Sequence, residues 1–138
     1  MRKWVPIAKP WQPANSEFPT GPITRELLQE CVETFSEPIP AVRDFHGLHE
    51  PGGKPNIPIG WLHAVEMRGD MLWGDLELNG DGEHELVGHP WGTAAIRLPE
   101  TTLYRDGKIT DGRMKARLIW VSLTNAPLMR DLPKITDV

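Results

Sequence analysis

The sequence contains one cysteine, three serines, no long hydrophobic run and no cluster of basic residues. The single Cys31 excludes an intramolecular disulfide framework and fits a reducing compartment. No stretch approaches the roughly 20 apolar residues of a membrane-spanning helix, and the N-terminus lacks the apolar region of a signal peptide. The sequence therefore predicts a soluble protein that is made in the cytoplasm and has no membrane partner.

The charge is modest and dispersed. The formal net charge is −4, and the lysines and arginines are scattered along the 138 residues. Binding to a phosphate backbone depends on clustered basic side chains that release counterions, so we expect no direct nucleic-acid partner. The 14 prolines and 13 glycines are many for this length, while hydrophobic content of 39% and charged content of 25% are ordinary for one globular domain. The excess therefore indicates turns and extended segments.

Residues 1–22 form a segment rich in proline and aromatic residues, which we predict to be an extended arm. Its five prolines remove backbone donors and fix φ, so it is predicted to run over a surface and not to form a helix or a central strand. Trp4, Trp11 and Phe18 lie between the prolines and need a surface that covers them. The arm either docks on a neighbouring subunit or partner through these side chains, or folds back on its own domain.

The remaining pattern predicts a mainly β, α+β domain over residues 23–133, a barrel or strongly bent sheet with flanking helices, followed by a tail, 134–138. A helix is predicted from Thr24, its N-cap, to Phe35, because apolar residues there recur at helical spacing. Strands are predicted over Ile39–Phe45, Ile59–Glu66, Met71–Leu78, Ala94–Leu98 with Thr101–Tyr104, and Met114–Leu123.

Two of these predictions concern individual side chains. Met71–Leu78 alternates between an apolar and a mixed face, and Gly69 supplies the positive φ of the hairpin turn before it. The second half of Met114–Leu123 is continuously apolar, which is typical of a strand buried on both faces. The side chains expected to be largely buried are Trp61, Leu76, Leu118, Trp120 and Val121.

The histidines do not form a convincing metal site. His84 and His89 resemble the zinc-protease motif H-E-x-x-H, but they are five residues apart, which places them about 140° apart around a helix. His46 and His49 lack the cysteine pair that usually accompanies such a spacing in zinc sites. We therefore expect no metal and no cofactor. A general base beside a Gly-rich loop is a better use of His46.

A nucleophile is harder to find. Ser16 lies in the arm, Ser36 at the end of the predicted helix and Ser122 inside a buried strand, and none of them occupies an elbow or a strand end. Thr101 and Thr102 are the remaining hydroxyls of interest, although threonine in a strand usually reflects β-propensity.

The order of these elements resembles the phage prohead (capsid maturation) protease family, closest to the I-type protease and scaffold proteins of Mu-like phages. The similarity spans roughly residues 23–133. It is carried by the helix ITRELLQECVETF, the strand leading to His46-Gly47, the Gly60-Trp61 strand start, the hairpin MRGDMLWGDLEL and the closing VSLTNAPLMRDLP.

The resemblance implies a herpesvirus-protease-like β-barrel with flanking helices and a Ser/His hydrolase that trims scaffold and capsid subunits. His46 matches the family histidine, with His49 as the alternative. The family serine falls between Leu98 and Thr102, where this chain has no serine.

The missing serine favours a catalytically silent head protein, structural or decorating, located in the virion head and in the host cytoplasm during assembly. Its partner would be the major capsid protein or its own oligomer, contacted through Trp4, Trp11 and Phe18. The alternative is an active maturation protease that uses Thr101 or Thr102 with His46. A third, weaker hypothesis is an interaction domain directed at a host protein.

Overall fold

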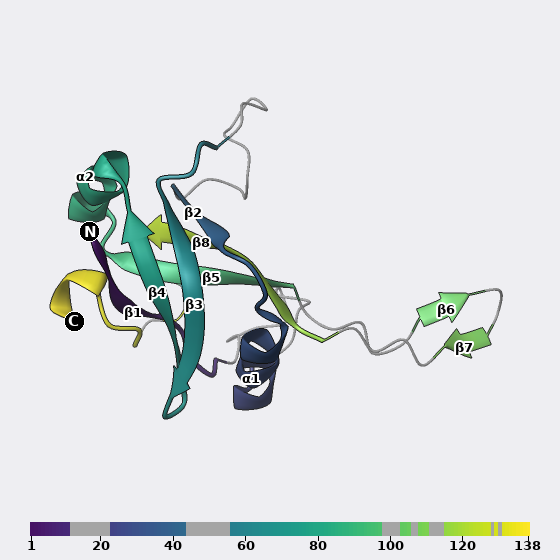
Figure 1. The fold of residues 1–138 in the computed structure, drawn as a ribbon. Coiled ribbons are helices and arrows are strands. Elements are labelled where there is room, and N and C mark those ends of the chain that lie inside the picture. The colour runs from purple at the N-terminus through teal and green to yellow at the C-terminus, as the bar shows by residue number, and fades with distance from the viewer. Residues whose placement is uncertain are drawn as a thin grey trace.

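A curled six-stranded sheet dominates the computed structural model, which describes residues 1–11, 23–43, 56–97, 103–105, 108–110, 115–127, 129 and 131–138. The strand order is β1-β4-β3-β2-β8-β5 (Figure 1). The strands of this sheet are β1 (Arg2–Ala8), β2 (Ile39–Arg43), β3 (Gly60–Arg68), β4 (Met71–Leu78), β5 (Trp91–Arg97) and β8 (Arg117–Thr124). A separate ribbon consists of β6 (Leu103–Arg105) and β7 (Lys108–Thr110), and the helical elements are α1 (Arg25–Thr34), α2 (Gly80–Gly88) and the 3-10 turn η1 (Ile135–Asp137).

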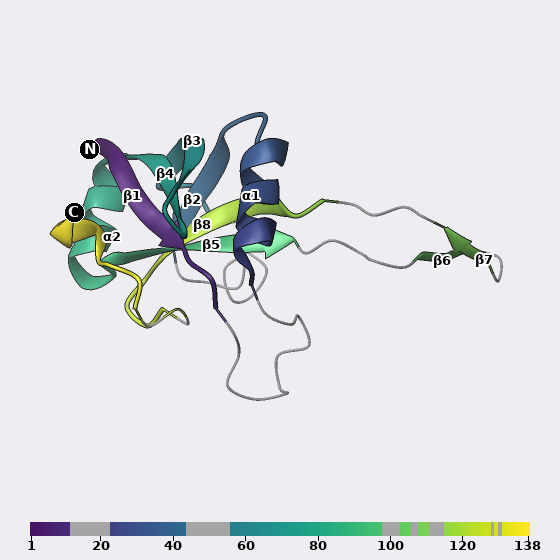
Figure 2. The ribbon, with the colours of Figure 1, turned by 90° about the horizontal axis from the view of Figure 1, so that it is seen from below.

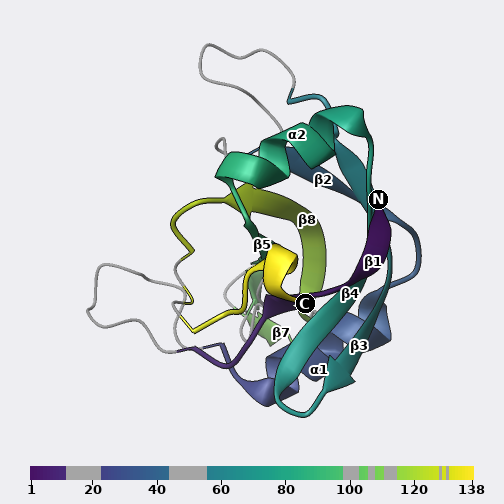
Figure 3. The same cartoon turned by 90° about the vertical axis from the view of Figure 1, so that its left-hand side faces the viewer.

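The sheet forms a half-barrel around the C-terminal turn. All neighbouring strands are antiparallel except β2 and β8, which are parallel. The curl brings the two edge strands, β1 and β5, into contact with each other. Figure 3 shows the strands arranged around η1, with α2 and α1 at opposite ends. This architecture confirms the predicted mainly β, α+β class and the bent sheet.

The inner face of the sheet builds the core, and on β4 the buried side chains alternate with outward-facing ones. Along β4, Leu72, Leu76 and Leu78 are buried, and Gly74 between them lets the side chain of Leu62 on β3 approach closely. The predicted two-faced strand Met71–Leu78 is therefore confirmed. Gly69 adopts a φ of 63° in the turn before it, as predicted.

Strand β1 lies inside the segment predicted to be an arm. It pairs with β4 from Arg2↔Glu77 to Ala8↔Leu72, and Val5 and Ile7 are fully buried. An edge strand needs backbone donors on one side only, so it tolerates Pro6, and the register shifts between Pro6 and Ala8. Residues 2–8 therefore follow the second alternative and fold on the domain's own sheet.

Helix α1 is fixed to the start of β8. The side chain of Thr24 accepts a hydrogen bond from the Leu27 amide at 3.2 Å, which confirms the predicted N-cap. At the other end, the Thr34 hydroxyl donates to the Ala116 carbonyl at 2.8 Å, and the Ala116 amide donates to Glu30 at 3.0 Å. Figure 2 shows this helix beside β8.

The C-terminal segment enters the half-barrel. Ile135 is fully buried, and its amide donates to the Pro90 carbonyl at 2.7 Å. The indole of Trp91 donates to the Leu132 carbonyl at 2.9 Å. The residues predicted to be a tail thus contribute a core side chain.

One burial prediction needs correction. Trp61 is 43% exposed, because its position on β3 turns it away from the inner face, whereas Leu76, Leu118 and Val121 are buried as predicted and Trp120 is intermediate in burial. Helix α2 runs from Gly80 to Gly88 after an Asn79 cap. No helix in the described part of the chain is long and apolar enough to cross a membrane.

Candidate functional site

The predicted catalytic residues His46, His49, Thr101 and Thr102 lie outside the residues that the structure describes, as does Phe18. Trp4 lies on β1, and Trp11 forms an isolated bridge with Ile23 through two backbone hydrogen bonds of 2.9 and 2.7 Å. The structure therefore places two of the three predicted partner-binding aromatics and none of the predicted catalytic groups.

The strand ends that lead to the predicted catalytic segments are nevertheless described. Strand β2, which precedes His46, ends at Arg43 opposite Leu123 of β8. Strand β5, which precedes Thr101, ends at Arg97 opposite Arg117, six residues earlier on β8. Six residues of strand span about 20 Å. Strands β2 and β5 thus end beside opposite ends of β8 (Figure 1).

The richest group of polar and aromatic side chains lies on the convex side of β1, β4 and β3, which we call the outer face. The same alternation that buries Leu72 and Leu76 turns the intervening side chains outward. The outer face consists of Arg2, Trp4, Trp61, His63, Glu66, Arg68, Trp73, Asp75 and Glu77.

Each of the two arginines on the outer face pairs with a carboxylate. Arg2 donates to both carboxylate oxygens of Asp75, from Nε at 3.2 Å and from Nη2 at 3.0 Å. This hydrogen-bonded carboxylate raises the pKa of Arg2. Arg68 donates from Nε to Glu66 at 2.6 Å, and its guanidinium lies over the rings of Trp4 and Trp73, at 5.2 and 4.6 Å from their centroids.

A β-bulge positions the histidine of this face. Between Leu62↔Leu76 and Val65↔Gly74, strand β3 carries one residue more than β4, so His63 and its neighbour oppose a single residue. The Nε2 atom of His63 lies 3.1 Å from Oε1 of Glu77. The contact is an ion pair only when the histidine is protonated.

Beside this pair, the outer face is hollowed into a cavity of about 370 Å³. That volume falls within the range of small-ligand sites. Trp61 and Glu77, which are cross-strand partners, form one wall of it. The rest of the lining comes from Met1, Arg2, Gly60, Leu78 and Asn79.

A second polar cluster joins the end of β2 to α2. Glu85 accepts contacts from Nε of Arg43 at 3.4 Å and from Nδ1 of His89 at 3.2 Å. His89 is the C-cap of α2, and its amide donates to the Glu85 carbonyl, while His84 is exposed. Within the described ranges, no three His, Cys, Asp or Glu side chains are grouped closely enough to hold a metal ion.

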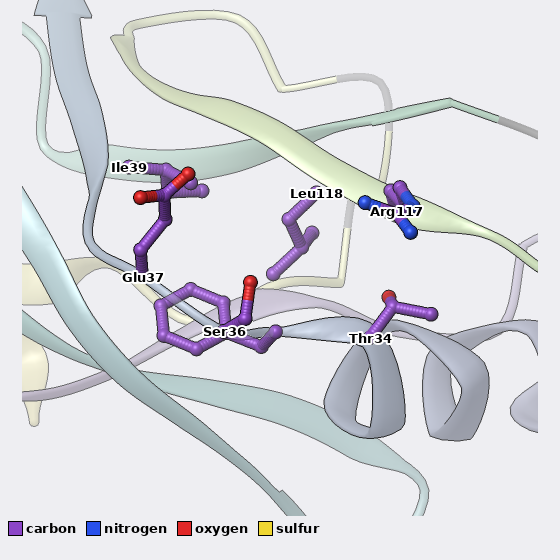
Figure 4. A pocket seen from close by; sticks show the side chains of 7 residues that line it. Thr34, Ser36, Glu37, Ile39, Arg117 and Leu118 are labelled. Atoms are coloured by element: carbon purple, nitrogen blue, oxygen red, sulfur yellow. The ribbon is translucent and has the colours of Figure 1, made fainter.

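A smaller cavity lies where α1 approaches β8 (Figure 4). Its volume of about 100 Å³ is below the range of small-ligand sites. The hydroxyl of Thr34 at its edge is already bonded to the Ala116 carbonyl. The outer-face cavity is therefore the better candidate site.

No protein-family model, curated protein or solved structure matches this chain. The candidate site therefore depends on its own geometry.

Sequence reasoning missed His63, Glu77 and Trp61 as site residues. The alternation of Met71–Leu78 was a usable signal, because it places Glu77 on the mixed face. The bulge at His63 has no such signal, since an extra residue in one strand becomes visible only when the register of its partner is known.

Proposed function

We propose that the protein is a head-associated structural or decoration subunit of a phage, built on a prohead-protease-like half-barrel and devoid of proteolytic activity. The resemblance in element order supports the phage assignment. In the sheet, the strand that leads to His46, the Gly60-Trp61 strand and the closing strand of the LTNAP motif are consecutive neighbours, in the order β3-β2-β8.

The separation of the strand ends at Arg43 and Arg97 carries the catalytically silent part of the proposal. A histidine base must lie within about 3 Å of the hydroxyl that it activates, directly or through one water. The chains that lead to His46 and to Thr101 depart about 20 Å apart along β8. The family serine is also missing from the segment after β5.

The test follows the chain and its substrates through head assembly. Co-expression with the head proteins should leave scaffold and capsid subunits uncleaved, and the chain should remain in purified mature particles. His46→Ala should change neither result. His84→Ala is a matched control, because His84 is an exposed histidine on α2. If His46→Ala alone blocks processing while the purified domain stays folded, the active-protease alternative is right.

A further inference from the structure

The outer face contains three tryptophans, and they differ in what covers them. Trp4 and Trp73 share the guanidinium of Arg68. Trp61 is 43% exposed and has no cation over its ring among the described side chains. An exposed indole face attracts cations through its quadrupole. Trp61 is therefore the open aromatic position of this face.

The carboxylate next to Trp61 keeps one oxygen without a hydrogen-bond donor among the described residues. Arg2 is paired with Asp75, Arg68 with Glu66, and the amine of Met1 with Glu83 at 2.9 Å. Glu77 contacts His63 through Oε1 and also attracts the charge of Arg2, but within the described part of the chain its Oε2 makes no hydrogen bond or ion pair.

We propose that the cavity between Trp61 and Glu77 binds a lysine or arginine side chain of a partner protein. The cation lies over the Trp61 ring and pairs with the free carboxylate oxygen of Glu77, while His63 holds the other oxygen in place. Arginine suits this site best, because a planar guanidinium stacks on an aromatic ring and hydrogen-bonds a carboxylate at the same time. Arg68 already makes this pair of contacts with Trp73 and Glu66 on the same face.

This inference rests on the proposed function and names the chemistry of the partner. Cation binding is measured on the isolated protein, without head proteins. Loss of head association with cation binding intact would sink the proposed function alone. Loss of cation binding with head association intact would sink this inference alone.

The experiment is a titration of the folded chain with Nα-acetyl-arginine amide and Nα-acetyl-lysine amide, followed by NMR at the indole N–H signals. Nα-acetyl-citrulline amide, a neutral analogue of nearly the same shape, is the control ligand. The Trp61 indole, assigned by its loss in Trp61→Leu, should shift saturably with the cationic ligands, and the Trp73 indole should not. Glu77→Gln should weaken the arginine affinity about three- to fivefold, which corresponds to one exposed cation contact.

Glu66→Gln is the matched control, because Glu66 and Glu77 are both 48% exposed on the same face and Glu66 is already paired with Arg68. It should leave the affinity unchanged. Binding of citrulline equal to that of arginine would show stacking without charge recognition, and equal effects of the two Gln variants would show nonspecific attraction. Either result, or the absence of a saturable shift at Trp61 in a well-dispersed spectrum, overturns the proposal.

Discussion

The guanidinium of Arg68 lies 5.2 Å from the ring centroid of Trp4, although β1 and β3 are not neighbouring strands. Trp73 on the intervening β4 lies under the same guanidinium at 4.6 Å. The stack ties β1 to the end of the β3–β4 hairpin on the outer face, while Val5 and Ile7 tie it to the core on the inner face. The first strand is therefore held from both sides of the sheet.

Ile7→Ala should destabilise the protein by about 2–5 kcal/mol, because it removes fully buried methyl groups and leaves a cavity. The free energy of unfolding is measured by urea denaturation. Lys3→Ala on the same strand is the control, with an expected change within about 0.5 kcal/mol, since its amine makes only an exposed hydrogen bond to the Val138 carbonyl. Equal, small effects of both variants would mean that β1 behaves as a detachable arm.

The stack on the outer face should show as a coupling energy between Trp4 and Arg68. A double-mutant cycle with Trp4→Leu and Arg68→Met should give about 0.5–1 kcal/mol, the size of an exposed cation–π contact. The same cycle with Trp61→Leu in place of Trp4→Leu should give a coupling near zero, because Arg68 lies over Trp4 and Trp73. Coupling of similar size in both cycles would contradict the arrangement.

Local patterns predicted the elements whose signal is contained in a few consecutive residues. The alternation of Met71–Leu78, the helix after Thr24 and the turn at Gly69 all depend on short-range geometry, and all three are confirmed. Strand β1 was missed because the proline rule was applied to the whole segment, whereas an edge strand tolerates Pro6. The parallel pairing of β2 with β8 joins residues about 80 positions apart, which no local pattern encodes.

The candidate site was predicted less well than the fold for a related reason. Trp61 was expected in the core because large aromatic side chains are usually buried, but its strand position turns it outward opposite Glu77. Whether the second carboxylate oxygen of Glu77 stays free depends on what every neighbouring charge contacts. Arg2 reaches Asp75 across strands that are 73 residues apart in sequence, so the charge balance exists only in the folded protein.

Helix α2 offers a paired test of close packing. A Cβ atom at Gly82 would lie 2.3 Å from the Ile59 carbonyl oxygen, which is backbone and cannot move aside cheaply. Gly82→Ala should therefore destabilise the protein by about 1–3 kcal/mol or more. Gly80, two residues earlier, has open space at its Cβ position, so Gly80→Ala should be neutral or stabilise by up to about 1 kcal/mol through helix propensity. Thermal unfolding of both variants measures this difference in stability. If Gly80→Ala were the more destabilising of the two, α2 would not pack on the segment before β3.

Cys31 should make stability depend on pH above the ordinary range of a thiol. Burial, with a smaller contribution from the charge of Glu30, raises its pKa from 9.0 to about 12. Below pH 9 the thiol is protonated in both states, and between pH 9 and 12 only the unfolded chain loses the proton, so stability falls as the pH rises through that window. The free energy of unfolding of the wild type should therefore decrease with pH more steeply than that of Cys31→Ala, by at most about 1.4 kcal/mol per pH unit, the limit for one proton. Parallel pH profiles of the two proteins, or rapid modification of the native thiol by a disulfide reagent near pH 8, would show that Cys31 is accessible to water.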